Sequence, residues 1–490
     1  MAMRNILLGG VGLGMLGLGA VVGIRTFQFA PAGVAASDDV QLAAAAQFDL
    51  PGAVNHLSRA VQFQTISHQD PSDNQITQWT QFQTWLLSTY PTVHSAMTRE
   101  IVGGAMLYKW EGSAPAEPAI IVMAHQDVVP VTEGTEKDWR HSPFAGDIAE
   151  NAVWGRGSVD DKGSLIGLFE ALEALAKTGF KPRRTIYLVS GHDEEAGGTG
   201  ARAVAQLLEQ RGVTALFTID EGSATILDAP VINGPAILIG IAEKGYATLK
   251  VTATAEGGHS SMPPKDTGVV NLAKAIIAIN NKPFPLELTG PGAQMLGSLA
   301  AHKGGITKVA MANQWLLGSL VTGQAGGTPS GAAMLHTTIA PTMLEGSPKE
   351  NVLPQTATAL INYRIAPWNR SSDVMARAKA AVGDMPVALS WVKPPREPSK
   401  ISSTSSLGWK LVSAAAQADA PDAIIAPYLV VAGTDSHSFE RISADVYRFM
   451  PLHFRIADTK MIHGTNEHMG IDSFKRMIIF YTRLIATSAG

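Results

Sequence analysis

Cysteine is absent from this 490-residue sequence. Its absence excludes disulfide bonds, thiolate metal sites and a cysteine nucleophile, so histidine, aspartate and glutamate must hold any metal. Charged residues are also scarce, at 16%, and the formal net charge of -4 offers no basic surface for a nucleic-acid partner. The length exceeds what one hydrophobic core usually supports, which predicts two domains after any targeting segment.

Charge is missing altogether from residues 6–24. A run of this length suits a membrane-crossing helix and also the core of a signal peptide, with residues 34–36 as a weak cleavage site. Residues 12–17 fit the GxGxxG pattern, but no strand precedes them and no βαβ unit follows, which argues against a nucleotide site. We therefore expect residues 1–36 to be a membrane anchor or signal segment that places the protein at a membrane or on its periplasmic or extracytoplasmic side.

Three apolar runs are each followed directly by acidic or imidazole side chains. Continuous apolar runs are typical of buried strands in an α/β sheet, and functional groups gather at the carboxyl edge of such sheets. The sequence therefore predicts an α/β catalytic domain, residues 37–244 and 367–490, with a mixed sheet flanked by helices. The runs are Ala119–Ala124 before His125 and Asp127, Thr185–Ser190 before Glu194 and Glu195, and Ala215–Ile219 before Asp220 and Glu221.

The pattern changes after residue 244. Apolar and polar residues alternate from Ala247 to Ala255 and again from Ala357 to Ile365, as in strands with one exposed face. Helical segments are expected between them, around Asn271–Asn280 and Gln294–Ala301. We predict that residues 245–366 form an inserted α+β lid domain that ends at the turn after its last strand.

Metal-binding side chains follow the predicted strands and also occur in two loops. Asp127 could accept the second ring N–H of His125 and so fix its tautomer. Of two adjacent glutamates at a strand end, one can bind a metal while the other stays free as a base. Such nitrogen and oxygen donors favour zinc, manganese or cobalt, and together they suffice for two metals that share one carboxylate. The candidates are His125, Asp160 in a glycine-rich turn, Glu194, Glu195, Asp220 or Glu221, and His463.

The order of these motifs resembles the aminoacylase/carboxypeptidase family of metallopeptidases, family M-20. The similarity extends over about residues 50–485, and it is strongest to the branch of carboxypeptidase S and the secreted N-acyl amino acid hydrolases. The motifs are HQD, GRGSVDDKG, GHDEEAGG, DEG, GGHSS, NVLP, NYR, GTDSH and HGTNE.

The resemblance implies a di-metal hydrolase that binds two Zn²⁺ ions. Glu194 would be the general base, Asp127 would support His125, and a cis peptide bond would join the bridging aspartate to Asp161. The implied ligands are Asp160 for both metals, His125 and Asp220 (with Glu221 as the alternative) for one, and Glu195 and His463 for the other.

The resemblance also assigns roles to residues of the lid and of a loop in the C-terminal part of the chain. His259 would help to stabilise the tetrahedral oxyanion. Asn351 and Arg364 would bind the substrate carboxylate, and Gly433 and Thr434 would offer backbone donors to it. Some members of the family complete the site across a lid-mediated dimer, whereas a lid as long as this one could act within a single chain, so a monomer and a homodimer both remain open.

The expected reaction is hydrolysis of an amide bond whose nitrogen belongs to an amino acid with a free carboxylate. The substrate is then a small N-acyl amino acid, with a fatty-acyl group included, or a short peptide trimmed by a carboxypeptidase or dipeptidase. A non-catalytic binding protein on the same fold is the alternative from another class, but every predicted catalytic position holds a competent residue.

Overall fold

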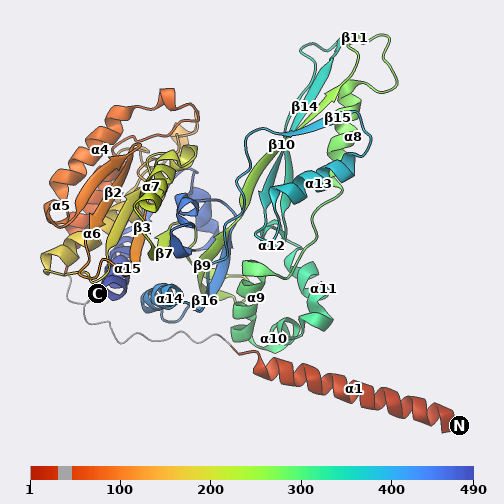
Figure 1. Ribbon diagram of the computed structural model, residues 1–490, viewed down its shortest axis with the longest axis horizontal. Helices are drawn as coiled ribbons and strands as arrows, with labels where there is room; N and C mark the ends of the chain where they lie inside the picture. The colour runs from red at the N-terminus through yellow and green to blue at the C-terminus, as the bar shows by residue number, and fades with distance from the viewer. Residues whose placement is uncertain (1, 31–46) are drawn as a thin grey trace.

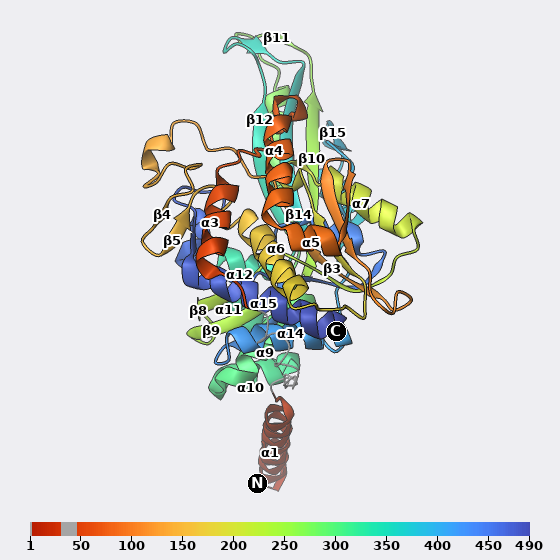
Figure 2. The same cartoon turned by 90° about the vertical axis from the view of Figure 1, so that its left-hand side faces the viewer.

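The computed structural model describes residues 2–30 and 47–490. Figure 1 shows an α/β domain from which an elongated lid extends, while helix α1 (Ala2–Gln28) leaves from the other end of the molecule. The view turned by 90° in Figure 2 agrees, with strand β11 (Gly258–His259) at the lid tip and α1 at the opposite end. The chain therefore has a large α/β part and a smaller elongated part, which we call the lid.

The α/β domain is built on a 10-stranded mixed sheet. Strand β3 pairs in parallel with both β6 and β7, so the carboxyl ends of the three predicted apolar strands meet at one edge. In sheet order the strands are β1 (Thr98–Val102), β2 (Ala105–Trp110), β6 (Ile186–Ser190), β3 (Ala119–Met123), β7 (Ala215–Asp220), β17 (Ser443–Arg448), β9 (Gly234–Glu243), β8 (Thr225–Ala229) and β18 (His453–Phe454), with β16 (Ile424–Val430) paired to β9.

Helices cover both faces of this sheet because its central strands are apolar on both sides. On β3, Ile120 and Val122 face the core shared with α6 and α15, whereas Ile121 and Met123 face the core shared with α7. Every residue of α6 from Lys162 to Leu175 is buried. The flanking helices are α3 (Leu50–Val61), α4 (Ile76–Thr89), α5 (Pro91–Ala96), α6 (Lys162–Lys177), α7 (Thr199–Gln210), α14 (Leu407–Asp419) and α15 (Ile471–Ala489).

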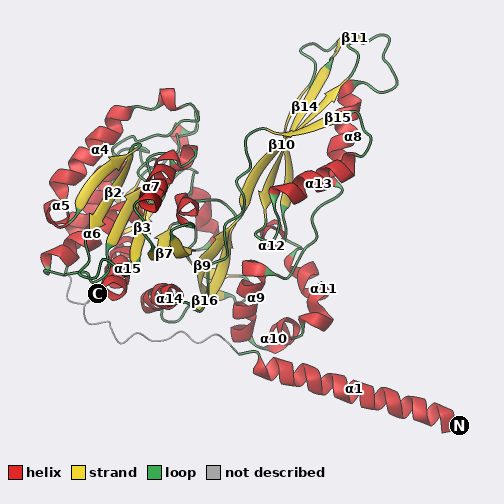
Figure 3. Ribbon diagram, in the orientation of Figure 1, coloured by secondary structure: helices red, strands yellow, loops and turns green. Residues whose placement is uncertain are grey.

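The lid contains a four-stranded antiparallel sheet with two helices packed against it (Figure 3). Buried and exposed residues alternate along β10, as the sequence predicts, and Leu249 and Val251 face the helices. In order the strands are β12 (Thr338–Glu345), β14 (Thr356–Ile365), β10 (Gly245–Thr254) and β15 (Val387–Trp391), with helices α8 (Gly268–Asn280) and α13 (Ser371–Val382) and the two-stranded tip β11 and β13 (Val352–Leu353).

The expected end of the lid at residue 366 is too early. Strand β15 pairs with β10 from Leu249↔Trp391 to Ala253↔Val387, and α13 contributes to the same core. The lid therefore extends beyond residue 391 before the chain returns to the large sheet. After β14 the chain turns, forms helix α13 and then adds β15 at the edge of the same sheet.

Four helices between α8 and β12 return to the edge of the large sheet. Leu299 of α9 packs against Ala236 of β9 and Ala426 of β16. These helices therefore join the lid to the catalytic domain at a place remote from the lid tip (Figure 1). They are α9 (Gly290–Lys303), α10 (Gly305–Ala312), α11 (Gln314–Ala325) and α12 (Pro329–Leu335).

Helix α1 contacts the protein through its C-terminal part. The Asn313 side-chain amide donates hydrogen bonds to the Val22 carbonyl, at 3.4 Å, and to the Thr26 hydroxyl, at 3.1 Å. None of the helices within residues 2–30 and 47–490 combines the length with the apolar character that crossing a bilayer requires. The expected cleavage site at residues 34–36 lies outside the described residues.

Candidate metal centre

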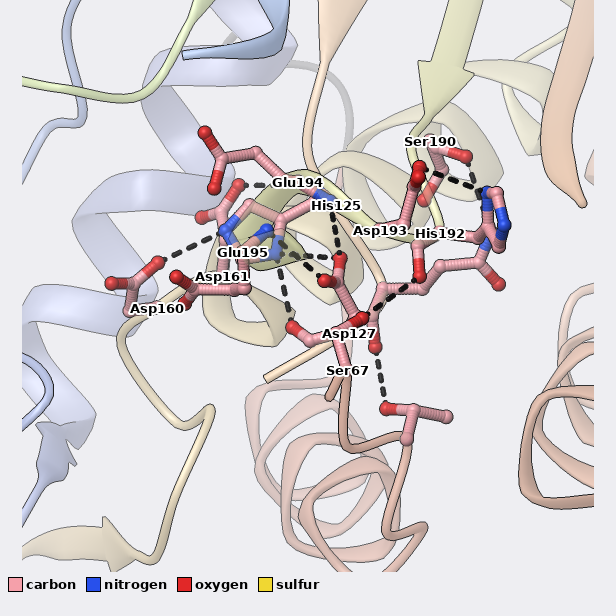
Figure 4. A network of polar contacts seen from close by, with 12 residues as sticks. Ser67, His125, Asp127, Asp160, Asp161, Ser190, His192, Asp193, Glu194 and Glu195 are labelled. Carbon is pink, nitrogen blue, oxygen red and sulfur yellow. Dashed lines mark hydrogen bonds and ion pairs between the residues drawn. The ribbon is translucent and has the colours of Figure 1, made fainter. Parts of the chain in front are cut away.

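The metal centre lies at the carboxyl edge of β6, β3 and β7. Figure 4 shows some of its side chains gathered together, among them His125, Asp160 and Glu195. His125 follows β3, Glu194 and Glu195 form a 3-10 turn just after β6, and Glu221 follows β7. A small sheet brings two further loops to this edge: β19 (His468–Gly470) pairs with β5 (Ala152–Trp154), which pairs with β4 (Ile148–Ala149). Asp160 lies in the loop after β5, and His463 lies in the loop before β19.

Asp160 holds an imidazole at each of its two carboxylate oxygens. His125 Nε2 lies 3.0 Å from Asp160 Oδ1, and His463 Nε2 lies 3.1 Å from Asp160 Oδ2. Each imidazole also faces an acid of its own: His463 Nε2 is 3.1 Å from Glu195 Oε1, and His125 Nε2 is 3.6 Å from Glu221 Oε1. The side chains therefore form two donor groups that share one carboxylate, as a pair of cations would require.

Burial concentrates negative charge in this site. The donor groups contain four acidic side chains, and burial raises the pKa of two of them, Glu194 and Glu221, well above the ordinary value. The pKa of His463 is raised to about 10 by its hydrogen bonds with Asp160 and Glu195. So many buried carboxylates are costly without positive charge beside them. The chemistry of the donor set thus fits bound cations, and sets of three donors lie within 4.8 Å of one another.

Asp127 orders the residues around the first imidazole. Its backbone carbonyl lies 3.0 Å from His125 Nδ1, and its carboxylate Oδ1 lies 3.4 Å from the same nitrogen. The two carboxylate oxygens accept the backbone N–H groups of Glu194 and Glu195, each at 3.1 Å. Asp127 therefore contacts His125 on one side and holds the turn that carries Glu194 and Glu195 on the other. The peptide bond between Asp160 and Asp161 is cis, as the resemblance implies.

The structure favours Glu221 over Asp220 as the metal ligand. Asp220 is the last residue of β7, and its Oδ2 accepts the backbone N–H of Ser436 at 2.9 Å. Neighbouring residues at a strand end point in opposite directions, so only one of the pair can face the metal site. We therefore correct the assignment: Asp220 anchors the loop at Ser436, and Glu221 faces His125.

Arg156 and Glu467 form a buried ion pair that sequence reasoning did not assign. Arg156 Nη1 lies 2.7 Å from Glu467 Oε2, and both side chains are almost fully buried. Glu467 Oε1 accepts the backbone N–H of Asp160 at 3.1 Å, while Arg156 Nη2 donates to the carbonyl of His463 at 3.2 Å. This pair therefore ties the loop of Asp160 to the loop of His463. The GRG and HGTNE motifs contained both residues, but nothing in the sequence paired them.

Three of the four residues expected to bind a substrate carboxylate, Arg364, Gly433 and Thr434, lie near one another at the base of the lid. Arg364 of β14 pairs with Tyr246 of β10, which also forms a bridge with Arg396. A Cβ on Gly433 would lie 1.6 Å from Nη2 of Arg396, so that guanidinium packs directly on the loop. The Thr434 N–H is already donated to Glu243 at 2.8 Å, which corrects the expectation that it is a free donor.

His259 and Asn351 are not at the metal centre in this chain. His259 pairs with Val352 in the two-stranded tip, and its ring accepts the Ser261 N–H at 3.1 Å. Both views place this tip at the far end of the lid, away from the edge of the large sheet (Figures 1 and 2). The arrangement thus does not bring the expected oxyanion donor to the metals within one chain.

Comparison with known proteins identifies the family. The model for "Peptidase family M20/M25/M40" matches residues 121–487. An N-fatty-acyl-amino acid synthase/hydrolase of Danio rerio is 34% identical, covering 88% of this chain and 84% of that protein. Carboxypeptidase S of Saccharomyces cerevisiae is 30% identical, covering 87% and 82%.

Solved structures of similar fold agree with this assignment. A metallo-carboxypeptidase of Sulfolobus solfataricus has a TM-score of 0.63 at 15% identity, covering 89% of this chain and 98% of that chain. Human carnosine dipeptidase 1 has a TM-score of 0.59 at 14% identity, covering 90% and 96%. The mixed sheet with flanking helices is therefore the fold of known metallopeptidases, and this chain is a metal-dependent hydrolase that belongs to peptidase family M20/M25/M40.

Proposed function

We propose that the protein hydrolyses the amide bond of N-acyl amino acids, fatty-acyl groups included, with two Zn²⁺ ions at the shared carboxylate. Manganese and cobalt are alternatives with the same donors. The observation that carries the proposal is Asp160, whose two oxygens each face one imidazole at about hydrogen-bond distance. His125 and Glu221 would hold one ion, and Glu195 and His463 would hold the other.

The chain's own residues supply the base and the orientation. When bound, the two cations polarise the scissile carbonyl and make an attacking water more acidic. Glu194 accepts the proton of that water and delivers it to the leaving nitrogen, in the manner of a general base and then a general acid. The carboxylate of Asp127 keeps Glu194 in place by accepting the backbone N–H of Glu194. Arg364 offers a guanidinium to the carboxylate of the departing amino acid.

The identity of the acyl half decides between an acylase and a carboxypeptidase. The curated relatives include proteins named for N-fatty-acyl amino acids and proteins named carboxypeptidase S, and the bond broken is the same in both. We favour N-acyl amino acids because the sequence similarity to the first group is slightly higher. Small peptides with a free carboxylate are the second substrate class.

The test is release of free amino acid by the zinc-loaded chain from a panel of N-acyl amino acids and dipeptides. Glu194→Gln keeps the size of the side chain and removes the base, and we expect turnover to fall roughly 10²–10⁴-fold. Glu136→Gln, in an exposed turn, is the matched control and should keep wild-type turnover. Wild-type-like turnover by Glu194→Gln would refute the mechanism, and no release by the wild type from any compound would refute the proposed substrates.

We also propose that the N-terminal segment attaches the protein to a membrane or directs its export. The support is the run of residues 6–24, which contains no charged side chain. A fatty-acyl substrate would reach such an enzyme through the lipid phase. Cell fractionation of the full chain, with and without a salt or carbonate wash, separates an anchored protein from an exported one.

A further inference from the structure

We propose that helices α10 and α11 form a surface that docks on an anionic lipid bilayer. This docking surface consists of Ile306, Trp315, Leu316 and Leu320, with Lys303 and Lys308 beside it. It is separate from the N-terminal segment, although the two would touch the same bilayer, and it requires no hydrolytic activity.

The first observation is an uncharged helix in which no residue is buried. Helix α11 has 12 residues and none is charged, yet none of the twelve, all of which the structure describes, is buried. Trp315 is 54% exposed and Leu320 is 64% exposed, and on α10 Ile306 is 83% exposed. Large apolar side chains gathered on adjacent helices in this way mark an interaction surface. Something apolar is therefore expected to cover them.

The second observation is the sign of the charge around these helices. Residues 288–344 contain no aspartate or glutamate, whereas Lys303 ends α9 and Lys308 lies on α10. Apolar side chains with a tryptophan among them, next to lysines and without acids, match the composition of helices that lie in the interface of anionic membranes. Lysines near such a surface are attracted by the negative charge of anionic lipids.

The third observation is continuity with α1. Arg25 and the hydrogen bonds of Asn313 hold the C-terminal part of α1 beside α10. Within the described part of α1, Leu16 is 75% exposed and Phe27 is 87% exposed. The figures show α1 leaving the molecule at the end where α10 and α11 lie, away from the lid tip (Figures 1 and 2). A bilayer that receives α1 would thus be near the docking surface.

A bilayer fits this surface better than a second copy of the chain. A two-fold contact would place the same patch against itself, so Lys303 and Lys308 would meet a surface in which residues 288–344 offer no acid to pair with them. Lipid phosphates supply the opposite charge. The consequence is a defined orientation, in which the α9–α11 edge of the large sheet faces the membrane and the lid tip points away.

The absence of cysteine makes a site-specific test direct. A single cysteine replaces Leu320 in the full chain and carries an environment-sensitive fluorophore. Leu344→Cys, 72% exposed on lid strand β12, is the matched control, and Leu18→Cys reports on α1. Each labelled chain is mixed with vesicles of phosphatidylcholine and phosphatidylglycerol that contain a spin-labelled lipid as quencher.

We expect the quencher to at least halve the fluorescence of the probe at position 320 and to leave that at position 344 unchanged. The double substitution Lys303→Glu and Lys308→Glu should reduce the quenching of the probe at position 320 on these vesicles. The quenching of the probe at position 18 should not change. Quenching at 18 but not at 320 would overturn the inference and leave the anchor alone. A concentration-dependent blue shift at 320 without lipid quenching would indicate a second copy and would also overturn it. None of these measurements uses turnover, so failure of the proposed hydrolysis is scored separately.

Discussion

Glu243 is a buried carboxylate at the junction of the catalytic domain and the lid, and replacing it with glutamine should destabilise the fold strongly. It is the last residue of β9, directly before the lid begins. Its Oε2 accepts the Thr434 N–H at 2.8 Å and lies 3.4 Å from Nε of Arg448, a fully buried arginine. Its Oε1 lies 3.3 Å from His437 and 3.5 Å from Arg396. Glutamine keeps the shape and removes the charge that the guanidinium groups of Arg448 and Arg396 face.

The magnitude follows from the ionisation of this group. Burial disfavours the charged form, but the charge of Arg448, a hydrogen bond with His437 and the charge of Arg396 outweigh it and lower the pKa of Glu243 from 4.5 to about 2. Because the folded-state pKa lies below the unfolded one, the ionised carboxylate stabilises the folded chain above about pH 4.5, and this contribution disappears as the pH falls toward 2. At neutral pH it amounts to about 3 kcal/mol.

The assay is urea unfolding of wild type and Glu243→Gln in the presence of a chelator, so that metal release does not contribute. We expect the variant to be less stable by about 3 kcal/mol at pH 7 and the difference to shrink steadily below about pH 4.5. Glu440→Gln is the control, since Glu440 lies 3.8 Å from the same Arg448 but burial raises its pKa. A Glu243→Gln chain within 1 kcal/mol of wild type at pH 7, or a pH-independent loss, would refute the reasoning.

Three further predictions concern the site. Glu221→Gln should reduce the bound zinc, measured by elemental analysis after dialysis, whereas Asp220→Asn should retain it; equal losses would contradict the corrected ligand assignment. Glu467→Gln should destabilise the chain by roughly 3–5 kcal/mol in urea unfolding because it leaves Arg156 buried and unpaired. Glu150→Gln, whose partner Arg140 is exposed, should cost less than about 1 kcal/mol, and similar losses in both would contradict this account. Gly433→Ala should raise KM through the overlap with Arg396, and Arg396→Ala in the same chain should relieve it.

The strand ends could be predicted because each depends only on local sequence. Continuous apolar runs predicted β3, β6 and β7, and these strands pair in parallel as an α/β sheet requires. Once three strands share an edge, the side chains that follow them must be near one another. That His125, Glu194 and Glu195 lie close together could therefore be expected from pattern alone.

Two errors have local physical causes. The choice between Asp220 and Glu221 depends on which side chain faces the metals, and a one-residue change in where β7 ends would reverse it. The lid boundary was missed because β15 is a short edge strand whose residues alternate only between half-buried and exposed. Such a strand carries a weak apolar signal, and only its pairing with Val251 and Leu249 of β10 shows where it belongs.

The remaining features depend on contacts between distant parts of the chain. Arg156 and Glu467 are 311 residues apart, and each alone could be an ordinary surface charge. Their pairing explains why the bridging aspartate and His463 lie together, since Glu467 binds the N–H groups of Gly157, Val159 and Asp160. The loop of the bridging ligand and the loop of the late histidine are thus one polar unit. Sequence motifs identify the ligands of such a centre, but the buried charges that hold the ligands in place become visible only when the chain is folded.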